Sequence, residues 1–293
     1  MAKEKLCITT DCVCDLPDYL LKKHNIDLIY FYINTDTGRF RDRDEITAQN
    51  VFEYYANNGQ KCVTTAPMVE DFNSFLKKKL QKYEEVLHIA TSDRVSKSMT
   101  NCITAIEQLG DAGKRVKVFD SKHLSSGLGL LVLRAAELLE NGCGCDEIIE
   151  ELTEMRERIS TSFISKNADY LYMNGRVNRN VKNFCNVFKI HPVLKMKDGE
   201  IKLNSFQIGD YQRSALRYVR KELKKKNAIE KEMLFVTHAG CTVSDRKLVR
   251  QEIDASGYFD EVLETNASAT VSGNCGPRTF GLLYAEKRKG KKE

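Results

Sequence analysis

Two adjacent threonines, Thr64 and Thr65, could hold an anion through their hydroxyl groups. Pro67 follows closely and keeps the residue before it out of the α conformation, so we expect the threonines in an extended or turn conformation. A helix is expected to begin at about Val69, and its N-terminus would add the positive end of the helix dipole. Neutral donors beside a helix N-terminus suit a carboxylate or a phosphate. The alternative is that the two threonines only complete a turn or cap the helix.

A second hydroxyl-rich segment, 91–98, follows an apolar run that is typical of a strand over residues 85–90. Ser92 and Ser96 stand in this segment, shortly before an expected helix. In parallel sheets, ligands bind outside the carboxyl ends of the strands. We therefore expect both hydroxyl segments to lie at this edge of a sheet and to converge on one ligand.

The first half of the chain alternates expected strands with expected helices, which predicts a parallel sheet covered by helices on both faces. The expected strands of this sheet are 6–10, 28–33, 85–90 and 116–119. The second half is expected to form a mixed sheet with helices, because Asp198-Gly199 joins two of its strands as a hairpin. We predict an α/β fold of two α/β domains, 1–160 and 161–293.

The composition is that of a protein with a sizeable core, since 42% of the residues are hydrophobic and 30% are charged. A length of 293 residues is consistent with two domains. No apolar run approaches the ~18 residues that span a bilayer, and the N-terminus lacks the apolar region of a signal peptide. We therefore expect a cytoplasmic protein with no integral membrane span.

The net charge of +5 does not indicate nucleic-acid binding. One basic cluster is the segment 288–292, and a second, 221–226, is expected on a helix with its charges facing several ways. A nucleic-acid binder more often gathers basic residues on one face, with aromatic residues between them. We expect no nucleic-acid partner. A role in transcription rests only on these clusters, and strong salt-dependent affinity for DNA would support it.

Neither the cysteines nor the histidines are spaced as metal ligands. The ten cysteines include no Cys-x-x-Cys pair, and the five histidines include no His-x-x-x-His pair. The sequence also lacks the P-loop pattern and the Gly-x-Ser-x-Gly elbow. No nucleophile stands beside an evident paired base. We predict a binding protein with no metal site, no catalytic residue and no cofactor.

Seven short blocks of the sequence resemble those of the DegV family, the bacterial fatty-acid-binding proteins, and they occur in the same order. The first four are 10–17 (Thr-Asp-Cys-Val-Cys-Asp-Leu-Pro), 64–67 (Thr-Thr-Ala-Pro), 92–98 and 118–129. The other three are 174–177 (Asn-Gly-Arg-Val), 191–199 and 274–277 (Asn-Cys-Gly-Pro). Each block is short, but their number and order make the combination specific.

The resemblance implies two α/β domains with one long-chain fatty acid between them, its carboxylate held by hydroxyl and amide donors and its tail in an apolar tunnel. It also implies that the protein has no chemistry of its own and presents the acyl carboxylate to a separate ATP-dependent fatty-acid kinase, which makes an acyl phosphate. The residues that fall on the family's carboxylate site are Thr64, Thr65, Ser92, Ser96, Asn274 and Cys275. Arg176 falls on an arginine expected to contact the partner or the phosphoryl group.

The sequence departs from the family pattern at three positions. Asn274 stands where the family usually has histidine, which removes a titratable donor but leaves an amide. Lys97 replaces a glycine beside Ser96 and adds bulk and a cation, and Arg278 replaces the second glycine of Gly-Pro-Gly. We expect fatty-acid binding to survive these changes, whereas the coupling to a kinase is left open.

The alternative function is that of a small-molecule enzyme on the same scaffold. Asp11, Asp120 or His238 would then do acid–base work on a polar substrate without a partner. This alternative predicts a polar cavity in place of a long apolar one. For His238, which follows an expected strand, a structural hydrogen bond is the simpler explanation.

Overall fold

The computed structural model describes residues 3–166, 168–175 and 177–288. Arg176 lies outside the described residues. The chain forms two compact units, and the first comprises Met1–Ile46, Val63–Glu157 and Asp198–Glu200. The second comprises Thr47–Cys62, Arg158–Lys197 and Ile201–Glu293. The predicted domains, 1–160 and 161–293, are segments expected to fold independently. The compact units do not test independent folding, so these domains stay a prediction.

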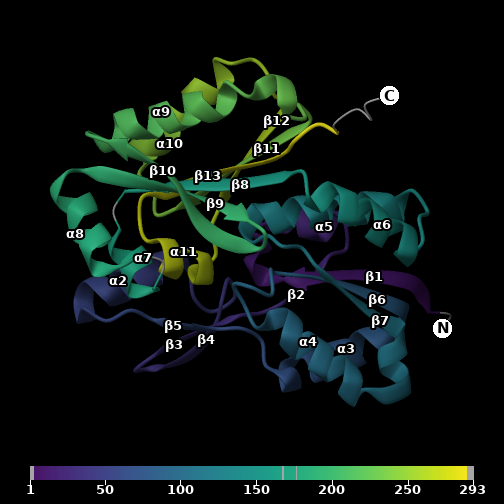
Figure 1. Ribbon diagram of the computed structural model, residues 1–293. Coiled ribbons are helices and arrows are strands. Elements are labelled where there is room, and N and C mark those ends of the chain that lie inside the picture. The colour runs from purple at the N-terminus through teal and green to yellow at the C-terminus, as the bar shows by residue number, and fades with distance from the viewer. Residues whose placement is uncertain (1–2, 167, 176, 289–293) are drawn as a thin grey trace. The chain divides into compact units, whose positions relative to one another are not determined.

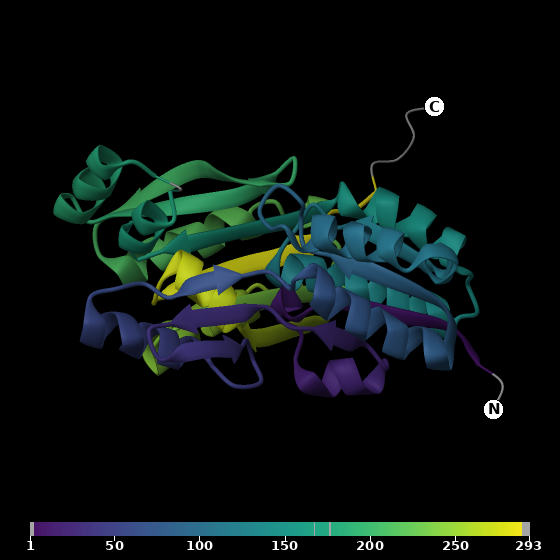
Figure 2. The same ribbon diagram turned by 90° about the horizontal axis from the view of Figure 1, so that it is seen from below.

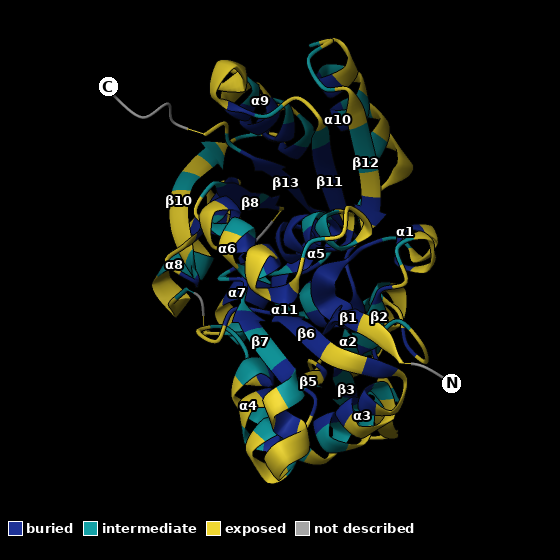
Figure 3. Ribbon diagram, turned by 90° about the vertical axis from the view of Figure 1, so that its right-hand side faces the viewer, coloured by how far each residue is buried: buried dark blue, intermediate teal, exposed yellow. Residues whose placement is uncertain are grey.

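The first unit is built on a parallel sheet with the strand order β2-β1-β6-β7 (Figure 1). Its strands are β1 (Glu4–Asp11), β2 (Asp27–Ile29), β6 (Tyr83–Ala90) and β7 (Val116–Asp120). Most residues of the two central strands, β1 and β6, are buried, as Figure 3 shows for β6 in dark blue. Central parallel strands are covered on both faces and therefore have continuous apolar runs. The predicted parallel sheet is confirmed.

Helices cover both faces of this sheet. The helices are α1 (Asp18–Lys23), α3 (Val69–Lys82), α4 (Ser98–Gln108), α5 (Ser125–Glu140) and α6 (Cys145–Arg156), with 3₁₀ helices at Cys12–Cys14 and Gly110–Arg115. α3 and α4 lie together along one face (Figures 1 and 2), where Phe72 and Leu76 share a core with Cys102. α5 packs against β1 and β6 on the opposite face. The carboxyl ends of the strands are thereby left to the connecting loops.

A separate antiparallel sheet of the first unit contains the two threonines. Its order is β4-β3-β5, and its strands are β3 (Tyr32–Thr35), β4 (Gly38–Arg41) and β5 (Val63–Thr65). Thr64 and Thr65 are extended, as predicted, and lie opposite Ile33 and Tyr32 in the register of the sheet. The expectation that this segment lies at the edge of the parallel sheet is wrong. The sequence conceals the difference, because residues 28–33 form one apolar run that the structure divides between β2 and β3.

The second unit is built on a six-stranded mixed sheet with the order β10-β9-β8-β13-β11-β12. Its strands are β8 (Ile159–Ser165), β9 (Ile190–Lys197), β10 (Glu200–Ile208), β11 (Met233–Ala239), β12 (Glu261–Asn266) and β13 (Thr279–Ala285). β11 and β12 are parallel, whereas β13 pairs antiparallel with both β8 and β11. Asp198 and Gly199 have φ of 54° and 80°, as a two-residue hairpin turn of type I′ requires. The predicted mixed sheet is confirmed.

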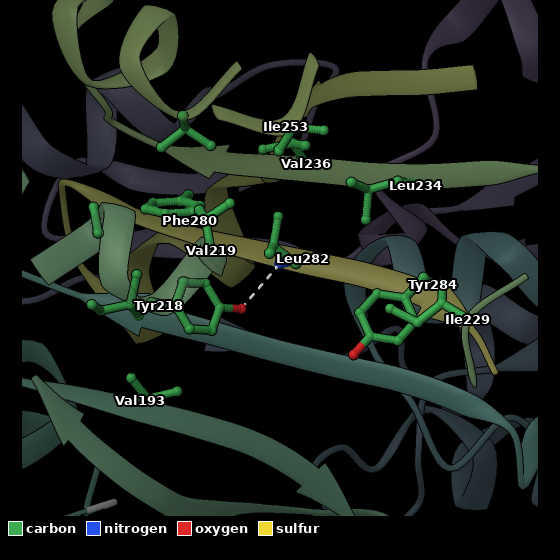
Figure 4. Close-up of a cluster of buried hydrophobic side chains, with 13 residues drawn as sticks. Val193, Tyr218, Val219, Ile229, Leu234, Val236, Ile253, Phe280, Leu282 and Tyr284 are labelled. Atoms are coloured by element: carbon green, nitrogen blue, oxygen red, sulfur yellow. Dashed lines mark hydrogen bonds between the residues drawn. The ribbon is translucent and has the colours of Figure 1, made fainter. Parts of the chain in front are cut away.

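One hydrophobic core lies between this sheet and the helices α9 and α10. The helices of the second unit are α2 (Ala48–Asn58), α7 (Asp169–Met173), α8 (Arg179–Val187), α9 (Tyr211–Leu223), α10 (Val243–Asp254) and α11 (Ala269–Cys275), with a 3₁₀ helix at Lys226–Ala228. Figure 4 shows the core, in which the hydroxyl of Tyr218 accepts a hydrogen bond of 3.3 Å from the backbone N–H of Leu282.

No helix in the described part of the chain is long and apolar enough to cross a membrane.

Candidate functional site

Asp11, the last residue of β1, is a fully buried carboxylate that lies beneath the hydroxyl-rich loop 91–98. The backbone N–H of Thr91 donates to its Oδ2 over 2.7 Å, and the hydroxyl of Ser98 donates to its Oδ1 over 2.6 Å. Nε2 of His88 lies 3.6 Å from the same Oδ1. Burial raises the pKa of Asp11, but His88 and the two hydrogen bonds outweigh it and hold the pKa below its usual value. Asp11 is therefore a charged anchor for both ends of the loop.

Ser92 has a fully buried side chain, and its hydroxyl proton is already in use. The hydroxyl donates to the backbone oxygen of Gly199 over 2.7 Å. The backbone oxygen of Ser92 accepts from the N–H groups of Val95 and Ser96, both over 3.1 Å. A serine has one hydroxyl proton, so in this conformation Ser92 supports the loop and cannot donate to a ligand. Its predicted contact with a carboxylate stays a prediction that would require the hydroxyl to turn away from Gly199.

Ser96 differs, because its hydroxyl accepts a bond and keeps its proton. Its Oγ accepts from the backbone N–H of Ser98 over 3.1 Å, and no described residue accepts the proton of the Ser96 hydroxyl. The side chain is partly buried. Lys97 is exposed, occupies the N-cap position of α4 without a side-chain capping bond, and forms no ion pair with a described residue. A donor and a cation thus stand together at the start of a helix.

Thr64 and Thr65 also keep their hydroxyl protons. Oγ1 of Thr65 accepts from the side-chain amide of Asn34 over 2.8 Å, and neither threonine donates its hydroxyl proton to a described residue. Neither of them caps the following helix, so the capping alternative is wrong: the N-cap of α3 is Met68. The backbone N–H of Met68 donates to Oδ2 of Asp71 over 2.8 Å. A carboxylate of the chain therefore already occupies the N-terminus of α3, which favours α4 as the helix that faces an external anion.

A hydrogen bond links the threonine segment to α4. The side-chain amide of Asn101 donates to the backbone oxygen of Pro67 over 2.7 Å. Asn101 lies in the N-terminal part of α4, and the loop that contains Ser96 leads into the same helix. The structure therefore associates the segment of Thr64 and Thr65 with the helix that follows Ser96, although the two segments belong to different sheets.

Asn274 and Cys275 lie in the second unit, at the end of α11. The side-chain amide of Asn274 donates to the backbone oxygen of Thr270 over 2.8 Å, within the helix. Cys275 is buried, and its backbone oxygen accepts from the hydroxyls of Ser165 and Thr279, each over 3.1 Å. These bonds fix the helix end. The predicted contact of Asn274 and Cys275 with a carboxylate stays a prediction.

Arg278 shows how the chain accommodates an arginine where the family pattern has glycine. Its φ is 55°, a conformation that favours glycine. Its guanidinium forms two hydrogen bonds with the buried carboxylate of Asp245, over 2.8 and 2.7 Å, and lies 4.8 Å from the ring centroid of Tyr211. Gly276, by contrast, has a φ of 83°, and a Cβ there would lie 2.7 Å from the ring of Tyr170. The loop thus retains the glycine that packing requires.

The three residues proposed for acid–base work belong to different units: Asp11 and Asp120 lie in the first unit and His238 in the second. His238 lies on β11 of the second unit, with 1% of its surface exposed, and neither ring nitrogen has a hydrogen-bond partner among the described residues. The predicted structural hydrogen bond is therefore wrong. Burial, followed by the charge of Arg246, lowers the pKa of His238 to about 4. Burial raises the pKa of Asp120, which lies at the end of β7. Asp11 has no exposed surface through which it could meet a substrate.

Among the described residues, no group of three or more histidine, cysteine, aspartate or glutamate side chains is arranged so that it could hold a metal ion.

Comparison with known proteins identifies the family. Residues 5–287 match the family model described as "Uncharacterised protein, DegV family". The chain belongs to the DegV family. A DegV domain-containing protein of Caldanaerobacter subterraneus is 26% identical over 290 residues, which covers 97% of this chain and all of that protein (100%).

Solved structures of DegV proteins share the fold. A DegV family protein from Thermus thermophilus, described as fatty acid binding, has a TM-score of 0.86 at 24% identity and covers 97% of this chain and 100% of its own. DegV from Bacillus subtilis, described as a fatty acid binding protein, has a TM-score of 0.83 at 19% identity, with the same coverage of 97% and 100%. The predicted family and α/β fold are both confirmed.

Three residues that organise the site escape prediction from the sequence. Ser98 and Asn101 stand at the beginning of a helix, where serine and asparagine are ordinary residues, and nothing in their spacing indicates distant partners. The sequence places Asp11 at the end of an expected strand, but this position suits a general acid, a general base or a structural anchor equally well. The bonds of Asp11 to Thr91 and Ser98 join residues far apart in the chain, so only the folded chain decides its role.

Proposed function

We propose that this DegV protein binds a long-chain fatty acid, with hydroxyl donors holding the carboxylate and an apolar tunnel holding the tail. One observation carries the proposal: Thr64, Thr65 and Ser96 all have hydroxyl protons that no described residue accepts. A carboxylate only accepts hydrogen bonds, so it complements such a set. The solved relatives described as fatty acid binding support the choice of ligand, as does a DegV protein from Eubacterium eligens described as loaded with heptadecanoic acid.

Neutral donors suit this ligand for a physical reason. A carboxylate is costly to remove from water unless several donors replace its hydration, and hydrogen bonds to charged groups contribute about 1.5–3 kcal/mol each. The hydrocarbon tail adds ~0.8 kcal/mol for every buried CH₂ group. We therefore assign most of the affinity to the tail and the orientation of the ligand to Thr64, Thr65 and Ser96.

The second part of the proposal concerns the fate of the ligand. A bound carboxylate oriented by neutral donors is suited to accept a phosphoryl group, so we infer presentation to a separate ATP-dependent fatty-acid kinase, with no cofactor in this chain. Arg176 is the residue proposed to contact the partner or the phosphoryl group. The ten cysteines suit a reducing compartment, and we place the protein in the cytoplasm.

Native mass spectrometry of the purified protein, followed by organic extraction and lipid analysis, tests the first part. We expect about one long-chain fatty acid per chain. Ser96→Ala and Thr64→Ala should each weaken binding of added fatty acid by about tenfold or more, because each removes a hydrogen bond to a charged group. Thr104→Ala is the matched control, since this exposed hydroxyl of α4 donates only to the backbone oxygen of Thr100.

A protein that is isolated empty and takes up no added fatty acid would contradict the proposal. So would equal retention by the Ser96→Ala, Thr64→Ala and Thr104→Ala variants. For the second part, acyl-phosphate formation is measured with an ATP-dependent fatty-acid kinase, using the wild type and Asn274→His. If fatty acid is bound but neither protein supports the reaction, the role as a kinase carrier is excluded while binding stands.

A further inference from the structure

The loop that contains Ser96 is held at both ends by one carboxylate. The two oxygens of Asp11 accept separately from the backbone N–H of Thr91 and from the hydroxyl of Ser98, over 2.7 and 2.6 Å. Asp11 and Ser98 are both fully buried, whereas Ser96 is partly exposed between them in the chain. Both bonds lie within the first unit. The position of the loop therefore depends on a group that no ligand can reach.

Ser98 connects this anchor to Ser96. Its hydroxyl is used by Asp11, and its backbone N–H donates to Oγ of Ser96 over 3.1 Å. A hydroxyl that accepts a hydrogen bond becomes a better donor, because hydrogen bonds in a chain polarise one another. The accepted bond also leaves the single proton of Ser96 available to an external acceptor.

We propose that Asp11 is the positioning residue of the carboxylate site, acting through Ser98 to hold the hydroxyl of Ser96 toward the ligand. This inference rests on the proposed function. Asp11 does not touch the fatty acid. It fixes the position of a neutral donor, and Nε2 of His88 lies 3.6 Å from its Oδ1.

The chain contains a matched control for this arrangement. Ser125, the first residue of α5, donates its hydroxyl to Oδ2 of Asp15 over 2.5 Å. Ser98 is likewise the first residue of its helix, and both serines are buried and donate to a buried carboxylate of the first unit. Ser125→Ala removes the same kind of bond at a side chain that donates to Asp15 and not to the loop of Ser96. A difference between the two alanine variants therefore reports position and not burial.

The experiment measures affinity for a fatty acid and for the fatty alcohol of the same chain length, in the wild type, Ser98→Ala, Ser125→Ala, Ser96→Ala and the double variant at residues 96 and 98. We expect Ser98→Ala to weaken fatty-acid binding by about tenfold, because the misplaced hydroxyl of Ser96 would lose one charge-assisted hydrogen bond to the carboxylate. Binding of the alcohol should change much less. Ser125→Ala should leave the acid-to-alcohol ratio unchanged. In the double variant, the effect of Ser98→Ala on this ratio should vanish, because the two residues act as one unit.

Additive effects of Ser96→Ala and Ser98→Ala would overturn the positioning role, as would an equal loss of acid and alcohol binding. Asp11→Asn provides a second measurement that keeps the side-chain volume, and a ratio equal to that of the wild type would overturn the role of Asp11. These results all leave fatty-acid binding by the wild type standing. A wild-type protein that binds neither ligand would overturn the proposed function itself and the positioning role with it.

Discussion

The two units each contain a buried carboxylate that fixes a loop, but the two carboxylates are satisfied in different ways. Asp11 is 0% exposed and accepts from a backbone N–H and a serine hydroxyl. Asp245 is 3% exposed and is paired with the guanidinium of Arg278 through two hydrogen bonds of 2.8 and 2.7 Å. Both have a pKa below the usual value, although burial acts in the opposite direction in each.

The difference teaches which group each carboxylate controls. The donors to Asp11 belong to the loop of Ser96, so any movement of that loop leaves a buried charge without its hydrogen bonds. The main partner of Asp245 is a side chain with 26% of its surface exposed, which can turn into water when the pair is broken. We conclude that Asp11 constrains its loop strongly, whereas Asp245 holds its loop by an interaction that is easier to release.

The largest expected effect separates the two carboxylates. Asp11→Ala should lower the free energy of unfolding by about 3–5 kcal/mol, because it leaves the donors of Thr91 and Ser98 buried without a partner. Asp245→Ala should lower it by only about 1–3 kcal/mol, since Arg278 can be solvated. Asp111→Ala is the control, as this exposed carboxylate pairs only with Lys114 on the surface, and it should change the value by less than about 0.5 kcal/mol.

Urea unfolding, followed by the fluorescence of the tyrosines, measures these differences through the midpoint at constant slope. Equal losses for Asp11→Ala and Asp245→Ala would contradict the comparison. A loss for Asp11→Ala no larger than that for Asp111→Ala would show that the loop can relax around the missing carboxylate.

The pH dependence of stability adds a histidine to the comparison. The pKa of His238 is lowered to about 4, mainly by burial, against about 6.5 in an unfolded chain. Oε2 of Glu264 lies 3.6 Å from Nε2 of His238 and favours the charged form, but this distance exceeds that of a hydrogen bond. Burial therefore dominates, and the folded protein keeps this histidine neutral.

The sign follows from proton uptake. Between pH 6.5 and about 4 the unfolded chain binds more protons at His238 than the folded one, so stability rises with pH in this window. Lowering the pH from 7 to 4 should cost about 3 kcal/mol at this residue, and His238→Phe should remove that part of the pH dependence. Asp11 and Asp245, with lowered pKa values, contribute stability above an unfolded pKa of about 3.9. They lose it only at lower pH. Unfolding curves at pH 7, 5.5 and 4 test this, and an unchanged slope in His238→Phe would contradict it.

The sequence predicts the architecture well where local patterns decide it. Alternating apolar strands and helices are enough to indicate the parallel sheet, and Asp198-Gly199 indicates the hairpin because both residues can adopt a positive φ. β12 (Glu261–Asn266) was not predicted. It is an edge strand with exposed Glu261, Glu264 and Asn266, so its sequence lacks the continuous apolar run of a central strand.

The candidate site shows where local patterns stop being informative. Ser92 and Ser96 look alike in sequence, yet Ser92 donates to Gly199 while Ser96 keeps its proton. The partner of Ser92 is 107 residues away in the chain, and no sequence pattern around either residue indicates the contact. Hydroxyl-rich loops can therefore be found from sequence, but the division between structural and available hydroxyls depends on long-range packing.

The smallest expected effect is the difference in stability between two variants of Arg278, the position where this chain departs from the family's glycine. Arg278→Ala should lower the free energy of unfolding by about 1–3 kcal/mol, because it leaves the buried carboxylate of Asp245 without the guanidinium and keeps a Cβ at a φ of 55°. Arg278→Gly removes the same pair but relieves a left-handed conformation that costs about 1 kcal/mol for a residue with a Cβ. Arg278→Gly should therefore be more stable than Arg278→Ala by about 1 kcal/mol. Urea midpoints decide between the variants: if they are equally stable, the backbone carries no strain at this position. In that case the pair of Arg278 with Asp245 offsets no backbone strain, and the whole of its free energy stabilises the loop.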